Sequence, residues 1–229
     1  METRILSDAD AVAAEAARWI AAEAREAVAA SGRFVLAVSG GRTPWRMLRA
    51  LAGEDVPWDG VHVVQVDERV APAGDPDRNL TGLRESLLPH APLPVERIHA
   101  MPVEQADLEG AARSYGRTLE RIAGTPPVLD VAHLGLGADG HTASLVPGDP
   151  VLDVADRDVA LTGVYVGRKR MTLTYPALDR SRRILWVVTG AEKAAMLPRL
   201  LAADASIPAG RVRRDRALVL TDVAAAGSP

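Results

Sequence analysis

An aspartate and a histidine two positions apart are the residues best suited to chemistry. Asp139 and His141 lie in the stretch GLGADGHTASL (135–145), directly after an apolar run that predicts a buried strand over 128–134. A histidine is a natural general base near neutral pH, and a neighbouring carboxylate can orient its ring and stabilise its charged form. The spacing therefore predicts an acid–base pair; the alternative is a hydrogen-bonded loop histidine without a chemical role.

A second stretch has the composition of an anion-binding loop. It follows a predicted strand over 34–38, and its residues are Ser39, Gly40, Gly41, Arg42, Thr43 and Pro44. Two glycines allow a ligand to approach the backbone closely, while Thr43 can cap a helix that Pro44 begins. Free N–H groups and the helix dipole favour an anion such as phosphate. The alternative is an ordinary strand-to-helix turn; it is not a Walker A loop, because the Gly-Lys-Ser/Thr ending is absent.

Further charged residues stand near the ends of predicted strands. Asp67 and Arg69 follow an apolar run over 61–66, where charges are costly unless they are paired or face a cleft. Arg170 and Lys193 lie near strands predicted over 171–174 and 184–189, and both can bind phosphate. Only two of the 27 basic residues are lysines, so Lys193 indicates a chemical role more strongly than an arginine would. The alternative for Asp67 and Arg69 is a solvated loop with an internal ion pair, and the alternative for Arg170 and Lys193 is a surface charge.

Other catalytic classes fit less well. Gly135, Gly137 and Gly140 match G-x-G-x-x-G, but this match lies past the middle of the chain, and Asp139 would place a carboxylate beside a pyrophosphate. Asp139 and His141 have no third metal ligand at short spacing, no G-x-S-x-G elbow occurs, and there is no cysteine. These observations argue against a dinucleotide site, a metal site at this pair, and a serine or cysteine nucleophile.

Composition limits the class of protein. The 229 residues leave room for one large domain or two small ones, and 48% hydrophobic residues predict a real core. A net charge of −3 argues against a general nucleic-acid binder, and no apolar run is long enough to span a membrane. The stretch Met1–Arg4 is unlike a secretory signal, so we expect a cytoplasmic protein.

Helical and strand patterns alternate along the chain. Ser7 with Asp10 resembles a capping box at the start of the first helix. The predicted helices cover 8–30, 45–52, 80–88, 104–123 and 191–202, and a loop covers 69–79. The predicted strands cover 34–38, 61–66, 128–134, 184–189 and 217–221, with weaker ones at 159–166 and 171–174. This order predicts an α/β fold with a mainly parallel sheet, helices on both faces, and ligands beyond the carboxyl ends of the strands.

Six stretches together resemble the 6-phosphogluconolactonase family, within the glucosamine-6-phosphate isomerase/deaminase superfamily. They occur in the family's order and spread over about two-thirds of the chain: VSGGRTP (38–44), VDERV (66–70), DPDRN (75–79), LGLGADGHTASLVPG (134–148), RMTLT (170–174) and GAEKAAML (190–197). The resemblance implies one Rossmann-like domain over 1–229. It also implies hydrolysis of 6-phospho-D-glucono-1,5-lactone to 6-phosphogluconate, the second step of the pentose phosphate pathway, without a cofactor.

The resemblance also implies roles for individual residues. Asp139 and His141 match the catalytic D-G-H, and we expect His141 to take a proton from the water that attacks the lactone carbonyl. Residues implied to line the sugar site are Asp67, counted with the catalytic group, Arg69 and Asn79. Residues implied to bind phosphate are Ser39, Gly40, Gly41, Arg42, Thr43, Arg170 and Lys193. The family more often has serine where Arg78 stands here, and often phenylalanine where Val146 stands.

The expected partner is a small phosphosugar lactone, not nucleic acid or a membrane, with the protein a monomer or small homo-oligomer. A deaminase of the same superfamily is an alternative, but there the resemblance implies a glutamate after the histidine loop, and residues 145–148 contain no carboxylate. A non-catalytic sugar-phosphate-binding protein is another alternative. Such a protein could have lost the base, so the presence of both Asp139 and His141 argues against it.

Overall fold

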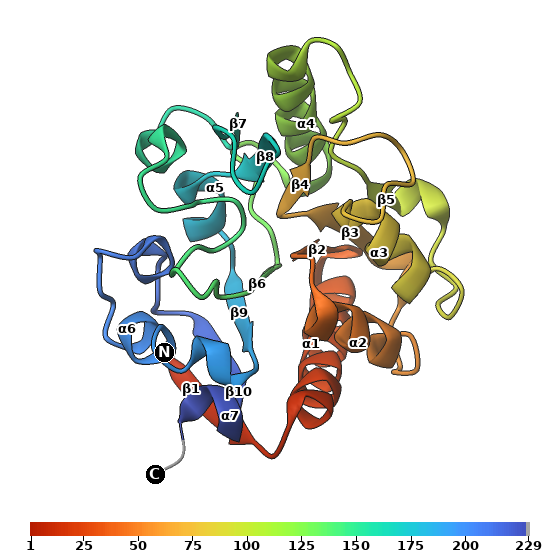
Figure 1. Ribbon diagram of the computed structural model, residues 1–229. Coiled ribbons are helices and arrows are strands. Elements are labelled where there is room, and N and C mark those ends of the chain that lie inside the picture. The colour runs from red at the N-terminus through yellow and green to blue at the C-terminus, as the bar shows by residue number, and fades with distance from the viewer. Residues whose placement is uncertain (228–229) are drawn as a thin grey trace.

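The computed structural model describes residues 1–227, which form two β-sheets with surrounding helices (Figure 1). The larger sheet has seven strands in the order β1-β10-β9-β6-β2-β3-β5, and every neighbouring pair is parallel. Its strands are β1 (Glu2–Leu6), β2 (Phe34–Val38), β3 (Val61–Gln65), β5 (Ile98–His99), β6 (Val131–Leu134), β9 (Arg183–Val188) and β10 (Ala217–Asp222). The smaller, antiparallel sheet has the order β4-β8-β7, with β4 (Asp67–Arg69), β7 (Val159–Leu161) and β8 (Arg170–Leu173).

Helices of very different length connect these strands. The α-helices are α1 (Ala9–Ser31), α2 (Arg42–Leu51), α3 (Asn79–Leu87), α4 (Leu108–Ala123), α5 (Tyr175–Asp179), α6 (Leu197–Leu201) and α7 (Val223–Ala226). Short 3-10 turns cover η1 (Trp58–Gly60), η2 (Val95–Arg97), η3 (Pro150–Asp153), η4 (Ala191–Lys193) and η5 (Pro208–Arg211). None of the helices within residues 1–227 is long and apolar enough to cross a membrane.

Both faces of the large sheet are covered, as predicted. Side chains alternate across β2: Phe34 and Leu36 pack in a core with α1, α2 and α3, whereas Val35 and Ala37 pack in a second core with α4 and the small sheet. A strand that is buried on both faces needs apolar residues at successive positions, which explains the uninterrupted run FVLAV. The predicted α/β, mainly parallel fold is confirmed.

The order of the strands places a switch point beside β2. The chain passes from β2 to β3 on one side, whereas β6 lies on the other side of β2. In open parallel sheets, loops that leave such a point on opposite sides create a crevice at the carboxyl edge. The loops that follow β2 and β6 are the two glycine-rich stretches singled out in the sequence.

Several predicted elements differ from those observed. The strands β1 and β5 were not predicted, because β1 is a largely exposed edge strand that begins with three polar residues and β5 has only two residues. The helix predicted over 191–202 is instead η4 followed by α6, and Pro198 near the start of α6 cannot supply the N–H that a continuous helix needs. The strand predicted over 159–166 ends at Leu161.

Two predicted helix starts are also corrected. Asp8, and not Ser7, caps α1: its carboxylate accepts hydrogen bonds from the N–H groups of Asp10 and Ala11. Ser7 donates its hydroxyl to Asp8 instead. The helix predicted from 104 begins only at Leu108, where the carboxylate of Asp107 caps it.

Candidate active site

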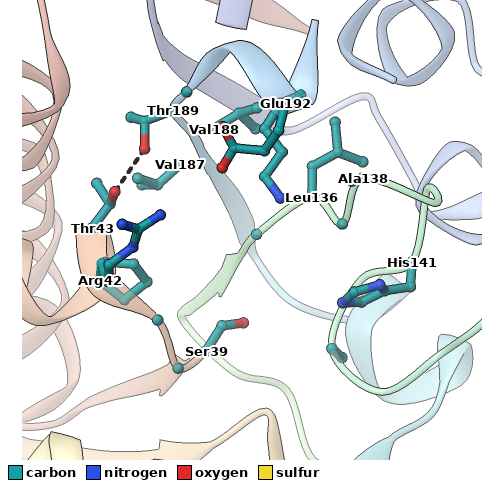
Figure 2. Close-up of a pocket in the computed structure, with 18 of the residues that line it drawn as sticks. Ser39, Arg42, Thr43, Leu136, Ala138, His141, Val187, Val188, Thr189 and Glu192 are labelled. Carbon is teal, nitrogen blue, oxygen red and sulfur yellow. Dashed lines mark hydrogen bonds between the residues drawn. The ribbon is translucent and has the colours of Figure 1, made fainter. Parts of the chain in front are cut away.

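All twelve predicted site residues line one pocket of about 680 Å³ at the carboxyl edge of the large sheet. The loop after β2, with Ser39 and Arg42, lies on one side of this space, and His141 lies on the other (Figure 2). The pocket residues that were predicted are Ser39, Gly40, Gly41, Arg42, Thr43, Asp67, Arg69, Asn79, Asp139, His141, Arg170 and Lys193. Segments far apart in the sequence therefore meet where the parallel strands end.

Asp139 and His141 form the expected pair. Nδ1 of His141 lies 2.5 Å from Oδ1 of Asp139, and the backbone N–H of His141 donates to the same oxygen. Burial alone would raise the pKa of Asp139, but its contacts with His141 and the hydroxyl of Tyr165 lower it below its usual value. An ionised Asp139 accepts a hydrogen bond from the N–H at Nδ1 of His141. In a neutral imidazole this leaves the lone pair on Nε2.

The glycine-rich loop brings the pair together by closing on itself. The N–H of Gly137 donates to the carbonyl of His141, and that of Gly140 donates to the carbonyl of Gly137. A Cβ at Gly137 would lie 2.1 Å from Nδ1 of His141, so any other residue there would displace the histidine ring. Turns and not a helix follow Gly140, so the loop lacks the helix N-terminus on which a dinucleotide pyrophosphate binds.

The loop after β2 leads directly into α2, and the first residues of this helix line the pocket. Gly41 is the N-cap residue of α2, and its φ of 133° is a conformation that other residues rarely adopt. Thr43 is therefore not the cap that the sequence predicted. Its hydroxyl lies 2.6 Å from that of Thr189, which follows β9, so Thr43 ties the loop to the end of a strand two positions away in the sheet (Figure 2).

Ser39 is tied to the sheet below the loop. Its N–H donates to Nδ1 of His133, and its hydroxyl donates to the carbonyl of His133. Complete burial lowers the pKa of His133 to about 3, so the ring is neutral and can accept this hydrogen bond. Ser39 thus fixes the start of the loop as well as lining the pocket.

Asp67 and Asn79 form a buried hydrogen-bonded group in the pocket wall. Oδ2 of Asp67 accepts from the hydroxyl of Ser144 at 2.6 Å, and its carbonyl accepts from Nδ2 of Asn79 at 2.9 Å. Nη1 of Arg69 donates to Oδ1 of Asn79, also at 2.9 Å. A Cβ at Gly40 would lie 1.9 Å from that same oxygen, so the loop after β2 and this group are in close contact.

Two arginines face each other across the small sheet. The sequence placed Asp67–Arg69 at the end of a buried strand, but these residues form β4, in which Arg69 lies directly opposite Arg170 of β8. Like charges at such positions are destabilising. The pKa of Arg170 is lowered, mainly by burial. The charge of Asp67 raises this pKa, and the charge of Arg69 lowers it further. An anion bound between the two guanidinium groups would relieve this repulsion.

The only two lysines have different surroundings. Lys193, in η4 after β9, lines the pocket, whereas Lys169 is exposed and does not. The turn before Lys193 is fixed by Asp222, whose carboxylate accepts from the N–H of Gly190. This difference agrees with the selection of Lys193 from the sequence.

Two functional residues were missed from the sequence. Tyr165 lines the pocket and donates to Asp139, and Ser144 holds Asp67, yet neither had a spacing that pointed to these partners. Ser144 stands within the GADGHTASL stretch, so its position in the motif was a usable signal. For residues 1–227, no group of three histidine or acidic side chains could hold a metal ion.

The fold and site define the class: an α/β protein with a cationic pocket at a switch point of its parallel sheet and an Asp–His pair in that pocket. A family model described as glucosamine-6-phosphate isomerases/6-phosphogluconolactonase matches residues 7–220. The chain belongs to this family.

Individual relatives narrow the comparison. A 6-phosphogluconolactonase from Synechocystis is 39% identical over 170 residues, which cover 72% of this chain and 70% of that protein. One from Mycobacterium tuberculosis is 35% identical over a match that covers 95% of this chain and 94% of that protein. The solved structure of 6-phosphogluconolactonase from Thermotoga maritima superposes with a TM-score of 0.85 at 26% identity, and the match covers 96% of this chain and 98% of that one.

Proposed function

We infer that this protein is a 6-phosphogluconolactonase, which hydrolyses 6-phospho-D-glucono-1,5-lactone to 6-phosphogluconate in the oxidative branch of the pentose phosphate pathway. The relatives that carry this name match between 72% and 96% of the chain. The observation that carries the chemistry is the 2.5 Å contact between Asp139 and His141 in a pocket with basic residues on several sides. A lactone is an activated ester, so this pair can catalyse its hydrolysis without a covalent nucleophile.

The proposed reaction begins at Nε2 of His141. This atom takes a proton from a water, whose oxygen forms a bond to the lactone carbonyl carbon, while Asp139 stabilises the imidazolium. The tetrahedral intermediate then collapses, the bond from this carbon to the ring oxygen breaks, and the ring oxygen takes the proton from His141. The product acid ionises in water. Arg69 is a candidate donor to the negative oxygen of the intermediate.

Binding of the phosphate is proposed at the opposite side of the pocket. The loop from Ser39 to Thr43 runs into the first turn of α2 and presents N–H groups and the charge of Arg42 there. Lys193 adds a positive charge to the pocket lining. The resemblance implies that Arg170 binds phosphate, but this arginine contacts Ser144 and Tyr165 and so also lies near the acid–base pair. We propose that it binds substrate together with Arg69 and that Asp67 and Asn79 hold these groups in position. A substrate anchored at its phosphate would place its carbonyl near His141.

A coupled assay tests this function. Glucose 6-phosphate is oxidised in situ to the lactone, and the product is measured with its NADP-dependent dehydrogenase against spontaneous hydrolysis. His141→Ala is expected to lose about 10²- to 10⁴-fold of the enzymatic rate. Its affinity for 6-phosphogluconate, measured by calorimetry, should persist, because the phosphate end is intact. His90→Ala, which changes an exposed histidine, is the matched control.

Two results would contradict the proposal. A wild-type protein that does not exceed the spontaneous rate would direct the search to amino-sugar phosphates, the substrates of the alternative deaminase. Turnover of His141→Ala close to wild type would remove His141 as the base. The single domain over 1–229, cytoplasmic location, lack of a cofactor or nucleic-acid partner, and state as a monomer or small homo-oligomer remain predictions.

A further inference from the structure

Tyr165 contacts the carboxylate that orients the proposed base. Its hydroxyl donates to Oδ2 of Asp139 at 3.0 Å, while Oδ1 of the same carboxylate meets Nδ1 of His141. Both carboxylate oxygens of Asp139 therefore have a hydrogen-bond partner, Oδ2 in the hydroxyl of Tyr165 and Oδ1 in the imidazole of His141. The terminal torsion of an aspartate is soft, so a hydrogen bond to the second oxygen restricts the rotation of the carboxylate.

The ring of Tyr165 also contacts two other site residues. It packs against His141 edge to face, with the centroids 5.6 Å apart and the planes at 66°. The guanidinium of Arg170 lies 4.9 Å from the centroid of the tyrosine ring. Tyr165 is thus in contact with the acid–base pair and with a proposed substrate-binding arginine.

The position of Tyr165 is fixed by the hairpin between β7 and β8. Tyr165 and Arg168 are joined by backbone hydrogen bonds in both directions across the turn. Nη2 of Arg168 contacts carboxylate oxygens of Asp75 at 3.0 Å and Asp77 at 3.2 Å, which ties the hairpin to the loop before Asn79. Val166 at φ 49° and Gly167 at φ 76° form the two-residue turn between Tyr165 and Arg168, where both central residues have positive φ.

We propose that Tyr165 is a positioning residue for the Asp139–His141 pair, an inference that rests on the proposed lactonase function. Its hydroxyl holds the Asp139 carboxylate so that Nδ1 of His141 retains its proton and Nε2 faces the attacking water. Burial, followed by the charge and hydrogen bond of Asp139, raises the pKa of Tyr165, so the hydroxyl keeps its proton at neutral pH.

Tyr165→Phe removes the hydroxyl but retains the ring and its contacts with His141 and Arg170. We expect kcat to fall about 5- to 30-fold with KM changed less than about twofold, because the lost hydrogen bond orients the base and does not bind substrate. The acidic limb of the kcat/KM profile should move to higher pH. Relieved of one donor, the Asp139 carboxylate would attract the imidazole proton more strongly.

Tyr175→Phe is the matched control. Its hydroxyl donates to the carbonyl of Pro208, and its ring contacts the guanidinium of Arg211, so a similar set of contacts is altered outside the pocket. Wild-type kcat, KM and pH profile are expected for this variant. The melting temperature of both variants shows whether each is folded.

A second measurement does not depend on turnover. The proton on Nδ1 of His141 should give a downfield NMR signal in the wild type, and that signal should shift or disappear in Tyr165→Phe but not in Tyr175→Phe. Wild-type kcat, pH profile and signal in Tyr165→Phe would overturn the inference. A raised KM with unchanged kcat would also overturn it, because it would place Tyr165 on the substrate. If the wild type fails to accelerate lactone hydrolysis but the signal depends on Tyr165, the proposed function fails and the positioning role stands.

Discussion

At the scale of single residues, the geometry of the Asp139–His141 pair depends on a missing side chain. Gly137 lies beneath both members, and a Cβ there would also lie 2.6 Å from Oδ1 of Asp139. At Gly135, two residues earlier, a Cβ would meet no other atom within 4 Å. The two glycines of one loop therefore differ: Gly137 makes space for the contact between Asp139 and His141, and Gly135 does not.

Gly137→Ala is expected to reduce kcat by about 10²-fold, since a displacement of about 1 Å at a catalytic group has an effect of this size. The melting temperature should change little, because Asp139 and His141 can move into the open pocket. Gly135→Ala should behave as wild type. The coupled assay and thermal unfolding of both variants check this. Equal kcat for the two variants would show that the close contact at Gly137 does not control the pair.

The closeness of Asp139 and His141 in sequence explains why this pair could be identified early. Their contact spans two residues, so it depends on local turn geometry that the glycine pattern already indicates. Ser144 and Tyr165 contact Asp67 and Asp139 across 77 and 26 residues, respectively. No local pattern encodes such distances, so these two residues could be found only in the folded chain.

At the scale of elements, β4 and the start of α3 are held together by one buried carboxylate. Glu68 is fully buried and accepts hydrogen bonds from the N–H groups of Arg69, Asn79 and Leu80. The guanidinium of Arg78 lies 3.0 Å from it as an ion pair and also donates to Glu104. Arg78 is therefore the cation that balances Glu68.

Arg78→Met should lower the free energy of unfolding by about 2–4 kcal/mol, because it leaves the carboxylate of Glu68 buried without its cation. The remaining N–H donors keep the loss below that of an isolated charge. Arg84→Met, at an exposed position on α3, is the control. Urea unfolding of both variants measures the effect. Equal midpoints would show that the N–H groups alone balance Glu68.

At the scale of the whole molecule, His133 joins two central strands beneath the pocket. It lies on β6 and accepts from Ser39 after β2, and its pKa is about 3 because burial disfavours the charged ring. In the unfolded chain a histidine has a pKa near 6.5. Between these two pKa values the unfolded state binds a proton that the folded state does not. The contribution of His133 to stability is therefore fully present above about pH 6.5 and is lost as the pH falls toward 3.

We therefore expect wild-type stability to fall by about 1–2 kcal/mol between pH 7 and pH 5 through His133. His133→Asn keeps an acceptor for the N–H of Ser39 but cannot titrate, so its stability should depend less on pH in this range. His90→Asn, at an exposed site, should retain the wild-type slope. Chemical unfolding at several pH values measures these slopes. Identical slopes for all three proteins would exclude His133 as the responsible group.

The sequence by itself determined the elements with strong local signals. Apolar runs such as 34–38 and 61–66 predicted buried parallel strands, and glycine, charge and Asp–His patterns predicted which loops carry chemistry. These features depend on neighbouring residues, so they can be read along the chain. The loops after β2, β6 and β9 meet at one pocket because parallel strands end at the same edge.

Only the tertiary structure decided how the loops meet. The pairing of β4 with β8, which sets Arg69 opposite Arg170, joins segments about one hundred residues apart. The exposed strand β1 depends on its pairing with β10 and not on its own composition. Tyr165 reaches Asp139 only because a hairpin folds over the pocket. Each of these contacts depends on long-range packing, which residue types and spacing do not specify.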